Sequence, residues 1–240
     1  FINCLNESGV DAHVAKISDQ RSGECLVLIT PDNERTMNTF LGSSSLLSEN
    51  DISKESIKDS HYLLIEGYLV TSEATLNVGI AAINMAHENN IKTVITLSDP
   101  NIVSYFRDNM MKLFSKKSHI IFCNEQEALN FSQADNLKDA EKFLKELTDM
   151  YIITLGSKGA ICFDGTNDHK ISGHQVESKD FTGAGDMFLG AFMHQYTGTN
   201  ILESMKFANY CASKIIQIYG AKFNNSNDYQ ELRKDFKSLI

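Results

Sequence analysis

The stretch best suited to chemistry is Asp180–Phe192, which reads DFTGAGDMFLGAF. Three small residues, Gly183, Ala184 and Gly185, precede Asp186, and apolar residues then recur at helical spacing. The pattern predicts a tight loop leading into a helix, whose free N–H groups and positive dipole end form an anion site. A carboxylate beside that site suits a reaction in which a hydroxyl loses its proton. From spacing alone, a purely structural glycine turn explains the stretch equally well.

Other nucleotide-binding signatures fit the chain less well. It has no GxxxxGK[ST] motif, which argues against a P-loop. Gly183 and Gly185 lack the third glycine of a dinucleotide fingerprint, and no acidic residue follows a second strand at the expected distance. We therefore disfavour a dinucleotide-dependent oxidoreductase.

Asn124 and Glu127 form a second constellation, directly after a predicted strand at His119–Phe122. Their spacing is typical of a helix capping box. The same amide and carboxylate could also reach a hydrated Mg²⁺, which takes few direct protein ligands. The two interpretations are compatible, because one helix end can be both capped and functional.

A third candidate is the segment TLGSKG at Thr154–Gly159. It follows a strand at Met150–Leu155 and precedes another at Ala160–Phe163, so a hairpin turn explains it in isolation. Lys158 could contact a phosphate or simply be solvated. Asp99-Pro100-Asn101 also follows a predicted strand, and an Asx-type turn explains it in isolation.

Strands and helices alternate with short links from Tyr62 onward. This order predicts an α/β fold with a doubly wound, mainly parallel sheet and helices on both faces. Ligands in such folds bind beyond the carboxyl ends of the strands, where the candidates lie. A continuous helix is predicted at Ile102–Phe114, and a long amphipathic helix at Ile201–Ile218.

Three extended segments come before this alternation, at Ala12–Ile17, Glu24–Thr30 and Arg35–Leu41. The first two read as a hairpin with a six-residue polar loop. We predict a small β segment over residues 12–41, apart from the main sheet, and an α/β core over residues 60–240.

The composition excludes several classes of protein. The chain has 240 residues, 42% of them hydrophobic, and a net charge of −9, with no long basic run. This balance argues against nucleic acid or an anionic membrane as partners. No apolar run reaches membrane-spanning length. The five scattered cysteines lack a C-x-x-C motif, which favours buried, reduced thiols and a cytoplasmic location.

The run D-x-T-G-A-G-D at residues 180–186 resembles the signature of the ribokinase-like (PfkB) family of sugar and nucleoside kinases. N-x-x-E at 124–127 and T-x-G-x-x-G at 154–159 resemble further motifs of that family, in the family's order. Asp99-Pro100-Asn101 resembles the family's D-x-N region near the phosphates. Arg35-Thr36-Met37, followed by Leu41-Gly42, resembles the adenosine-kinase-like branch in particular.

The resemblance implies roles for individual residues. Asp186 would be the catalytic base, and the backbone of Gly183, Ala184 and Gly185 would stabilise the transferred phosphoryl group. Mg²⁺ would be oriented through Asn124 and Glu127. Nucleotide contacts would come from Thr154, Gly156, Lys158, Gly159, Thr182 and Asn209. Arg35 would face the substrate, and Asp180 with Thr182 could hold a monovalent cation.

The sequence thus favours an ATP-dependent, Mg-assisted kinase acting on a primary hydroxyl of a sugar or ribonucleoside. The alternative is a catalytically inactive nucleotide-binding or regulatory module of the same family. The resemblance also implies an N-terminal stretch, with the first core strand and a Gly-Gly substrate motif, which nothing here matches. In the family that the chain resembles, the small sheet is a lid over the sugar site. Unpaired strand edges of this lid could recruit a second copy, giving a homodimer.

Overall fold

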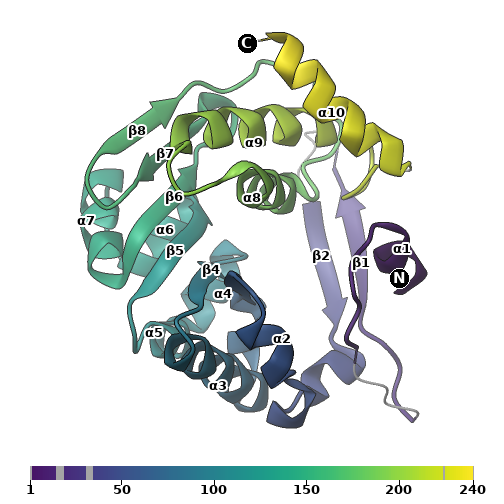
Figure 1. The fold of residues 1–240 in the computed structure, drawn as a ribbon, viewed down its shortest axis with the longest axis vertical. Coiled ribbons are helices and arrows are strands. Elements are labelled where there is room, and N and C mark those ends of the chain that lie inside the picture. Colours follow the sequence, from purple (N-terminus) through teal and green to yellow (C-terminus); the bar gives the residue numbers. More distant parts are fainter. Residues whose placement is uncertain (1, 15–18, 31–34, 224, 240) are drawn as a thin grey trace.

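The computed structural model describes residues 2–14, 19–30, 35–223 and 225–239. Its strands form two separate sheets, one of six strands in the order β3-β4-β5-β6-β7-β8 and one of two strands (Figure 1). The strands are β1 (Glu24–Ile29), β2 (Arg35–Phe40), β3 (Tyr62–Glu66), β4 (Lys92–Thr96), β5 (Ser118–Asn124), β6 (Thr148–Thr154), β7 (Ala160–Phe163) and β8 (Asp168–Ile171).

Ten α-helices and four short 3-10 helices occur in the described ranges. The α-helices are α1 (Ile2–Glu7), α2 (Lys54–Lys58), α3 (Glu73–Glu88), α4 (Pro100–Tyr105), α5 (Arg107–Leu113), α6 (Glu125–Ser132), α7 (Leu137–Leu147), α8 (Ala184–Gln195), α9 (Ile201–Ile215) and α10 (Ser226–Leu239). The 3-10 helices are η1 (Gly42–Leu46), η2 (Glu49–Asp51), η3 (Gly67–Thr71) and η4 (Gly156–Lys158).

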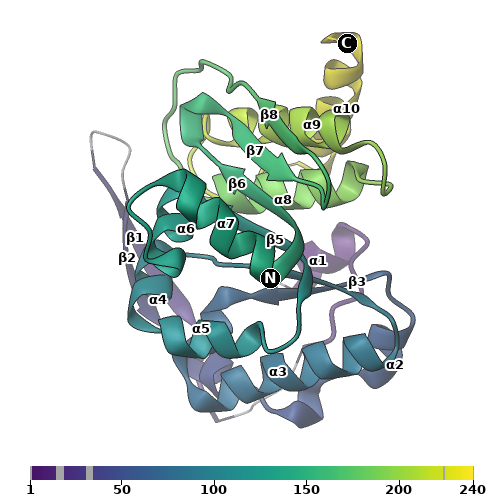
Figure 2. The same ribbon diagram turned by 90° about the vertical axis from the view of Figure 1, so that its left-hand side faces the viewer.

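The large sheet has a separate apolar core on each face. Neighbouring strand residues alternate between them: Ile121 packs with α3–α7, whereas Ile120 and Phe122 pack with α8–α10. The two helix layers lie on opposite sides of the sheet in Figures 1 and 2. This confirms the predicted doubly wound α/β fold, in which strands covered on both faces are almost wholly apolar.

Strands β3 to β6 are parallel, and β7 and β8 continue the sheet antiparallel. The carboxyl ends of β3, β4, β5 and β6 therefore meet along one edge. The loops that follow these strands, and the start of α8, supply the candidate residues described below.

The small sheet corrects the predicted hairpin. β1 pairs antiparallel with β2, with Cys25 opposite Thr39 and Leu28 opposite Thr36. Residues 12–14 form no strand, and residues 15–17 of the predicted strand lie outside the described part of the chain. Among the described residues β1 therefore pairs with β2, a partner that alternation of residue types alone did not identify.

A second correction concerns the helix predicted at Ile102–Phe114. Phe106 leaves the helical conformation, with φ −119° and ψ 28°, and separates α4 from α5. The guanidinium of Arg107, the next residue, donates through Nε a 2.8 Å hydrogen bond to the carbonyl of Phe131. This long-range contact lies at the break and has no signature in local periodicity.

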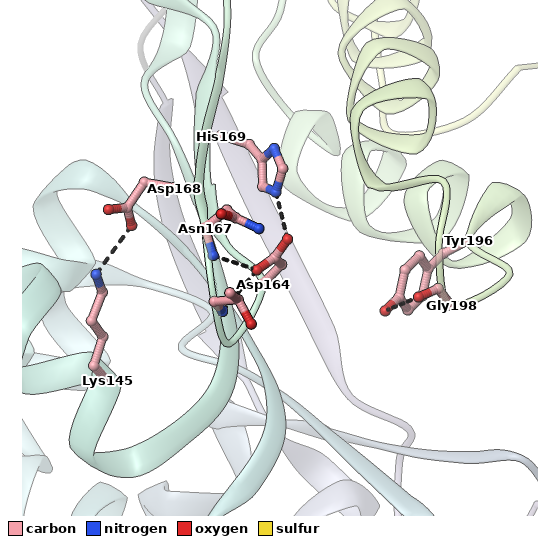
Figure 3. Close-up of polar contacts among 8 residues, drawn as sticks. Lys145, Asp164, Asn167, Asp168, His169, Tyr196 and Gly198 are labelled. Carbon is pink, nitrogen blue, oxygen red and sulfur yellow. Dashed lines mark hydrogen bonds and ion pairs between the residues drawn. The ribbon is translucent and has the colours of Figure 1, made fainter.

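Far from the carboxyl-end edge, a tight turn joins β7 to β8. One oxygen of Asp164, Oδ1, accepts hydrogen bonds from the N–H groups of Thr166 and Asn167, and Oδ2 contacts Nε2 of His169 at 2.6 Å (Figure 3). These bonds lower the pKa of Asp164 to about 2. Lys145 of α7 bonds Asp168 beside this turn.

All five cysteines are free, and Cys123, Cys162 and Cys211 are buried as predicted, whereas Cys25 is exposed. Of the helices in the described ranges, none has the length and apolarity needed to cross a membrane.

Candidate active site

A cavity of about 690 Å³ runs along the carboxyl-end edge of the large sheet. It is bounded by the ends of β3 to β6, the start of α8, one face of α9 and a residue of β2. The motifs singled out in the sequence converge here from positions far apart in the chain, because parallel strands bring their carboxyl ends together.

The helix start predicted at the glycines is present. Gly183 precedes α8 with φ +79°, a left-handed conformation that favours glycine. Ala184 donates its N–H to the carbonyl of Phe181, so this group is already bonded. The N–H groups of Gly185 and Asp186 have no hydrogen-bond partner among the described residues, as expected in a first helical turn. The exposed carboxylate of Asp186 lines the same cavity.

The buried side chain of Asp180 holds the loop before α8 in place. It is 1% exposed, and its two oxygens accept 2.8 Å hydrogen bonds from the N–H groups of Thr182 and Gly220. A side chain on Gly183 would lie 2.8 Å from the Cα of Ala221. The turn after α9 therefore buttresses the loop directly, which leaves room only for glycine at position 183.

Asn124 and Glu127 form a complete capping box at the start of α6. Asn124 accepts the N–H of Glu127 at 2.8 Å, and Glu127 accepts the N–H of Asn124 at 2.9 Å. Asn124 Nδ2 also donates to Glu127 Oε1 at 2.7 Å. Both residues line the cavity. The capping interpretation of the sequence is therefore correct, and the pair is also placed where a ligand could meet it.

The segment after β6 lies farther along the same edge. Thr154, Gly156 and Gly159 line the cavity. Gly159 has φ +100°, and a Cβ there would collide with the carbonyl oxygen of Ile171. Lys158 is not among the lining residues; its Nζ lies 3.7 Å from Oε2 of Glu125.

Two further predicted contacts come from the helical side of the cavity. Asn209 of α9 lines it and donates through Nδ2 to the carbonyl of Ser172 at 3.0 Å. Thr182 also lines it, and its buried Oγ1 is one of two buried side-chain atoms in the described ranges without a hydrogen-bond partner.

The predictions for Arg35 and Asp99 have different outcomes. Arg35 lies on β2, but its side chain is outside the described part of the structure. Its neighbour Met37 lines the cavity. Asp99 caps α4 by accepting the N–H groups of Asn101 and Ile102, as the turn interpretation predicted, and it does not line the cavity.

Glu66 and Tyr68 are among the lining residues that sequence reasoning missed. They follow β3, so the rule that candidates follow parallel strands could have identified them. The pKa of Tyr68 is raised to about 12, mainly by burial and in smaller part by nearby carboxylates that include Asp99 and Asp186. Negative charge is therefore concentrated at this end of the cavity.

Comparisons with known proteins agree with this architecture. Residues 1–228 match the family described as pfkB family carbohydrate kinase, so the chain belongs to this family of kinases. A ribokinase of Staphylococcus aureus is 22% identical over 88% of this chain and 69% of its own length.

Two solved structures share the fold. Adenosine kinase from Sinorhizobium meliloti aligns with a TM-score of 0.92 and 25% identity, over 100% of this chain and 73% of that one. A putative ribokinase II from E. coli, solved in complex with ATP and Mg²⁺, aligns with a TM-score of 0.85 and 20% identity, over 98% and 78%.

Proposed function

We propose that this chain transfers the γ-phosphoryl group of ATP to a primary hydroxyl of a sugar or ribonucleoside, assisted by Mg²⁺. The observation that supports this most is the start of α8, where Asp186 and the unbonded N–H groups of Gly185 and Asp186 line one cavity. In the reaction, the bond between the γ-phosphorus and its bridging oxygen breaks, and ADP leaves. The acceptor oxygen bonds to phosphorus, and its proton passes to the Asp186 carboxylate.

The anion hole that we propose consists of the backbone N–H groups of Gly183, Gly185 and Asp186; the N–H of Ala184, which the family resemblance assigns to it, is instead bonded to the carbonyl of Phe181. Their positions are set by the left-handed backbone of Gly183 and by Asp180, which accepts a hydrogen bond from the N–H of Thr182. Donors fixed before the reaction stabilise developing charge without reorganisation. Because phosphoryl transfer has a loose transition state, Asp186 contributes more through orientation than through base strength.

The nucleotide would occupy the part of the cavity between β6 and α9. The proposed contacts are Thr154, Gly156, Lys158, Gly159, Thr182 and Asn209. Five of them line the cavity, and Lys158 lies just outside beside Glu125. The ATP seen in the E. coli ribokinase II supports ATP as the phosphoryl donor here.

Asn124 and Glu127 fit Mg²⁺ that is held through water. Both residues line the cavity while their oxygens accept the capping bonds of α6. Mg²⁺ typically keeps several waters and takes few direct protein ligands, so one amide and one carboxylate can orient it. Bound Mg²⁺ would neutralise phosphate charge, as its presence with ATP in the E. coli relative suggests.

A monovalent cation beneath the anion loop is a separate proposal. Its support is the buried Thr182 Oγ1, which has no partner among the described residues, near the buried carboxylate of Asp180. K⁺ should then raise the turnover rate at constant ionic strength, and Thr182→Val should remove that response. Equal rates in K⁺ and in a bulky organic cation would contradict it.

We further propose that the small sheet is a lid through which two copies pair. Cross-strand register places Leu26, Leu28 and Phe40 on one face of it, 62%, 52% and 54% exposed. Met37 is on the opposite face and lines the cavity. Light scattering should give a dimer mass that Leu28→Glu lowers; a monomer mass for the unaltered protein would contradict the pairing.

The kinase proposal is tested by a coupled assay for ADP with ATP, Mg²⁺ and a panel of sugars and nucleosides. We expect acceptor-dependent ADP release and a phosphorylated product by mass spectrometry. Tight ATP binding with no transfer to any acceptor would instead favour a nucleotide-binding regulatory module.

A further inference from the structure

The five cysteines differ in the surroundings of their sulfur atoms. Cys123, Cys162 and Cys211 are buried, and burial raises the pKa of each thiol, to about 12 for Cys162 and Cys211. These three thiols stay protonated near neutral pH, and a protonated, buried thiol is inert. Cys25 is exposed and Cys4 is partly exposed. An oxidant in solution therefore reaches Cys4 and Cys25 first.

The sulfur of Cys4 lies against an amine. Cys4 belongs to α1, and Lys222 belongs to the turn between α9 and α10. Nζ of Lys222 donates a 3.2 Å hydrogen bond to Sγ of Cys4, across 218 positions of the sequence. This hydrogen bond is the main cause that raises the pKa of Lys222, and the charge of the Cys4 sulfur adds to it. The sulfur of Cys25 instead contacts the hydroxyl of Thr39 at 3.4 Å.

The turn that carries Lys222 is the one that supports the loop before α8. The N–H of Gly220 bonds the carboxylate of Asp180, and the Cα of Ala221 lies against Gly183. Lys222 follows Ala221 directly and is exposed. No residue of α1 is buried. The contact between the amine and the thiol therefore joins an exposed helix to a turn that is fixed against the candidate active site.

We propose that Cys4 and Lys222 form a peroxide-sensitive modification site, at which oxidation of the thiol joins the two side chains through a sulfur–nitrogen bond. A partly exposed cysteine beside a cationic group has the surroundings in which cysteine side chains react. The neighbouring amine then supplies a nucleophile at contact distance. This site is independent of the proposed kinase reaction.

The reaction has two steps and uses hydrogen peroxide as the oxidant. In the first step, the sulfur of Cys4 attacks one peroxide oxygen, the S–O bond forms and the O–O bond breaks. Sulfur loses two electrons to the peroxide, whose other oxygen leaves as water with the proton of the thiol, and a sulfenic acid remains.

In the second step, the amine of Lys222 loses its extra proton to water and attacks the sulfur of Cys4. The S–N bond forms, the S–O bond breaks, and the hydroxyl group leaves as water with a proton of the amine. Sulfenic acids condense with backbone nitrogen in the same way. Two molecules of a thiol reductant reverse the reaction, because they become a disulfide and return the thiol and the amine.

The link should change the stability of the protein. A covalent S–N bond is shorter than the 3.2 Å contact, so α1 and the turn after α9 are drawn together. The link also closes a loop of more than two hundred residues, which restricts the unfolded chain. The oxidised protein should therefore unfold at a higher denaturant concentration than the reduced protein. Hydrogen exchange at the N–H of Gly220 should become slower.

The test is peptide mass spectrometry of the unaltered protein after treatment with hydrogen peroxide. We expect a pair of peptides linked through Cys4 and Lys222, lighter by two hydrogen atoms than the separate peptides together. The linked pair should disappear after reduction with a thiol. A dione reagent that traps sulfenic acids, added with the peroxide, should label Cys4 several-fold faster than Cys25.

Matched variants separate the role of the amine from that of its charge. Lys222→Arg keeps a cation and N–H donors, but a guanidinium does not lose a proton to become a nucleophile. Cys4 should then form trapped sulfenic acid at a similar rate and no link. Cys4→Ser should give no link and no shift of the unfolding midpoint with peroxide, whereas Cys25→Ser should link normally.

Three results would overturn the proposal. The first is the absence of linked peptides from the peroxide-treated unaltered protein. The second is a linked pair of the same mass change in Lys222→Arg, which would place the nitrogen elsewhere. The third is equal labelling of Cys4 and Cys25 by the sulfenic acid trap, which would mean that the neighbouring amine gives Cys4 no selectivity.

Discussion

The backbone N–H of Gly220 donates a 2.8 Å hydrogen bond to Oδ2 of Asp180, joining two segments 40 residues apart. The other oxygen of the same carboxylate accepts the N–H of Thr182. One buried side chain thus ties the turn after α9 to the loop that starts α8. The geometry of the proposed anion hole therefore depends on a residue that does not itself line the cavity.

Asp180→Asn should affect both stability and activity. The asparagine amide keeps one acceptor oxygen, but its NH₂ group faces a backbone N–H that needs an acceptor. We therefore expect a loss of about 1–3 kcal/mol in the free energy of unfolding. The loop should also move, and phosphoryl transfer should fall at least about tenfold. Chemical denaturation and steady-state kinetics measure the two effects.

Asp164→Asn is the matched control. Asp164 also accepts two backbone N–H groups, but in the turn at the far end of β7 (Figure 3). The Asp164→Asn variant should have a lower free energy of unfolding and an unchanged turnover rate. Equal losses of activity in the two variants at a temperature where both are folded would mean that Asp180 has no specific role in the loop.

The capping and magnesium roles of Asn124 can be separated by experiment. Asn124→Ala should cost about 0.5–2 kcal/mol as a lost helix cap. If Asn124 also orients hydrated Mg²⁺, the Mg²⁺ concentration for half-maximal rate should rise several-fold. The measurement is a Mg²⁺ titration of the rate at fixed ATP.

The chain provides a close control at α7, where Asn136 bonds the N–H and carboxylate of Asp139 in the same Asn-x-x-acid pattern. Asn136→Ala should lose comparable stability while its Mg²⁺ dependence stays unchanged. An identical Mg²⁺ response in both alanine variants would leave Asn124 with a capping role alone.

A pair of histidines at the opposite edge of the sheet predicts a pH dependence of stability. The rings of His87 and His119 lie 6.0 Å apart, and His87 Nε2 is buried without a partner among the described residues. Burial lowers the pKa of both; Lys116 lowers that of His87 further, while Asp149 opposes the shift of His119. The folded state therefore favours neutral rings.

As pH falls below the unfolded value of about 6.5, the unfolded chain takes up protons first, so the free energy of unfolding should decrease. Above that value this contribution is fully present. His87→Leu should flatten the profile between about pH 7 and 5 in urea denaturation, whereas His61→Gln at an exposed position should not. A profile for His87→Leu that is parallel to that of the unaltered protein would contradict the assignment.

The sequence predicted part of the cavity lining, because its motifs follow parallel strands or begin helices. Asn124, Thr154 and Gly183 could be assigned to one cavity once the β-α alternation was recognised. Met37 could not, because its place depends on how a separate sheet docks over the site. Glu66 had the required position after a strand, but nothing in its local composition distinguished it from a solvated acid.

The features of the fold that the local sequence pattern did not predict depend on long-range contacts. The partner of β1 is set by cross-strand pairing with β2. The helix break at Phe106 occurs beside the long-range bond from Arg107 to Phe131, which no helical period records. Lys158 follows a glycine turn as predicted, yet its ammonium lies toward Glu125.

The central claim is that Asp186 at the start of α8 receives the proton of the acceptor hydroxyl. Asp186→Asn preserves the size of the side chain and the N–H groups of the helix start, so ATP affinity measured by calorimetry should change little. The turnover number, measured by coupled release of ADP, should fall at least about a hundredfold, as for a lost general base. Near-normal turnover in this variant, with ATP binding intact, would contradict the account.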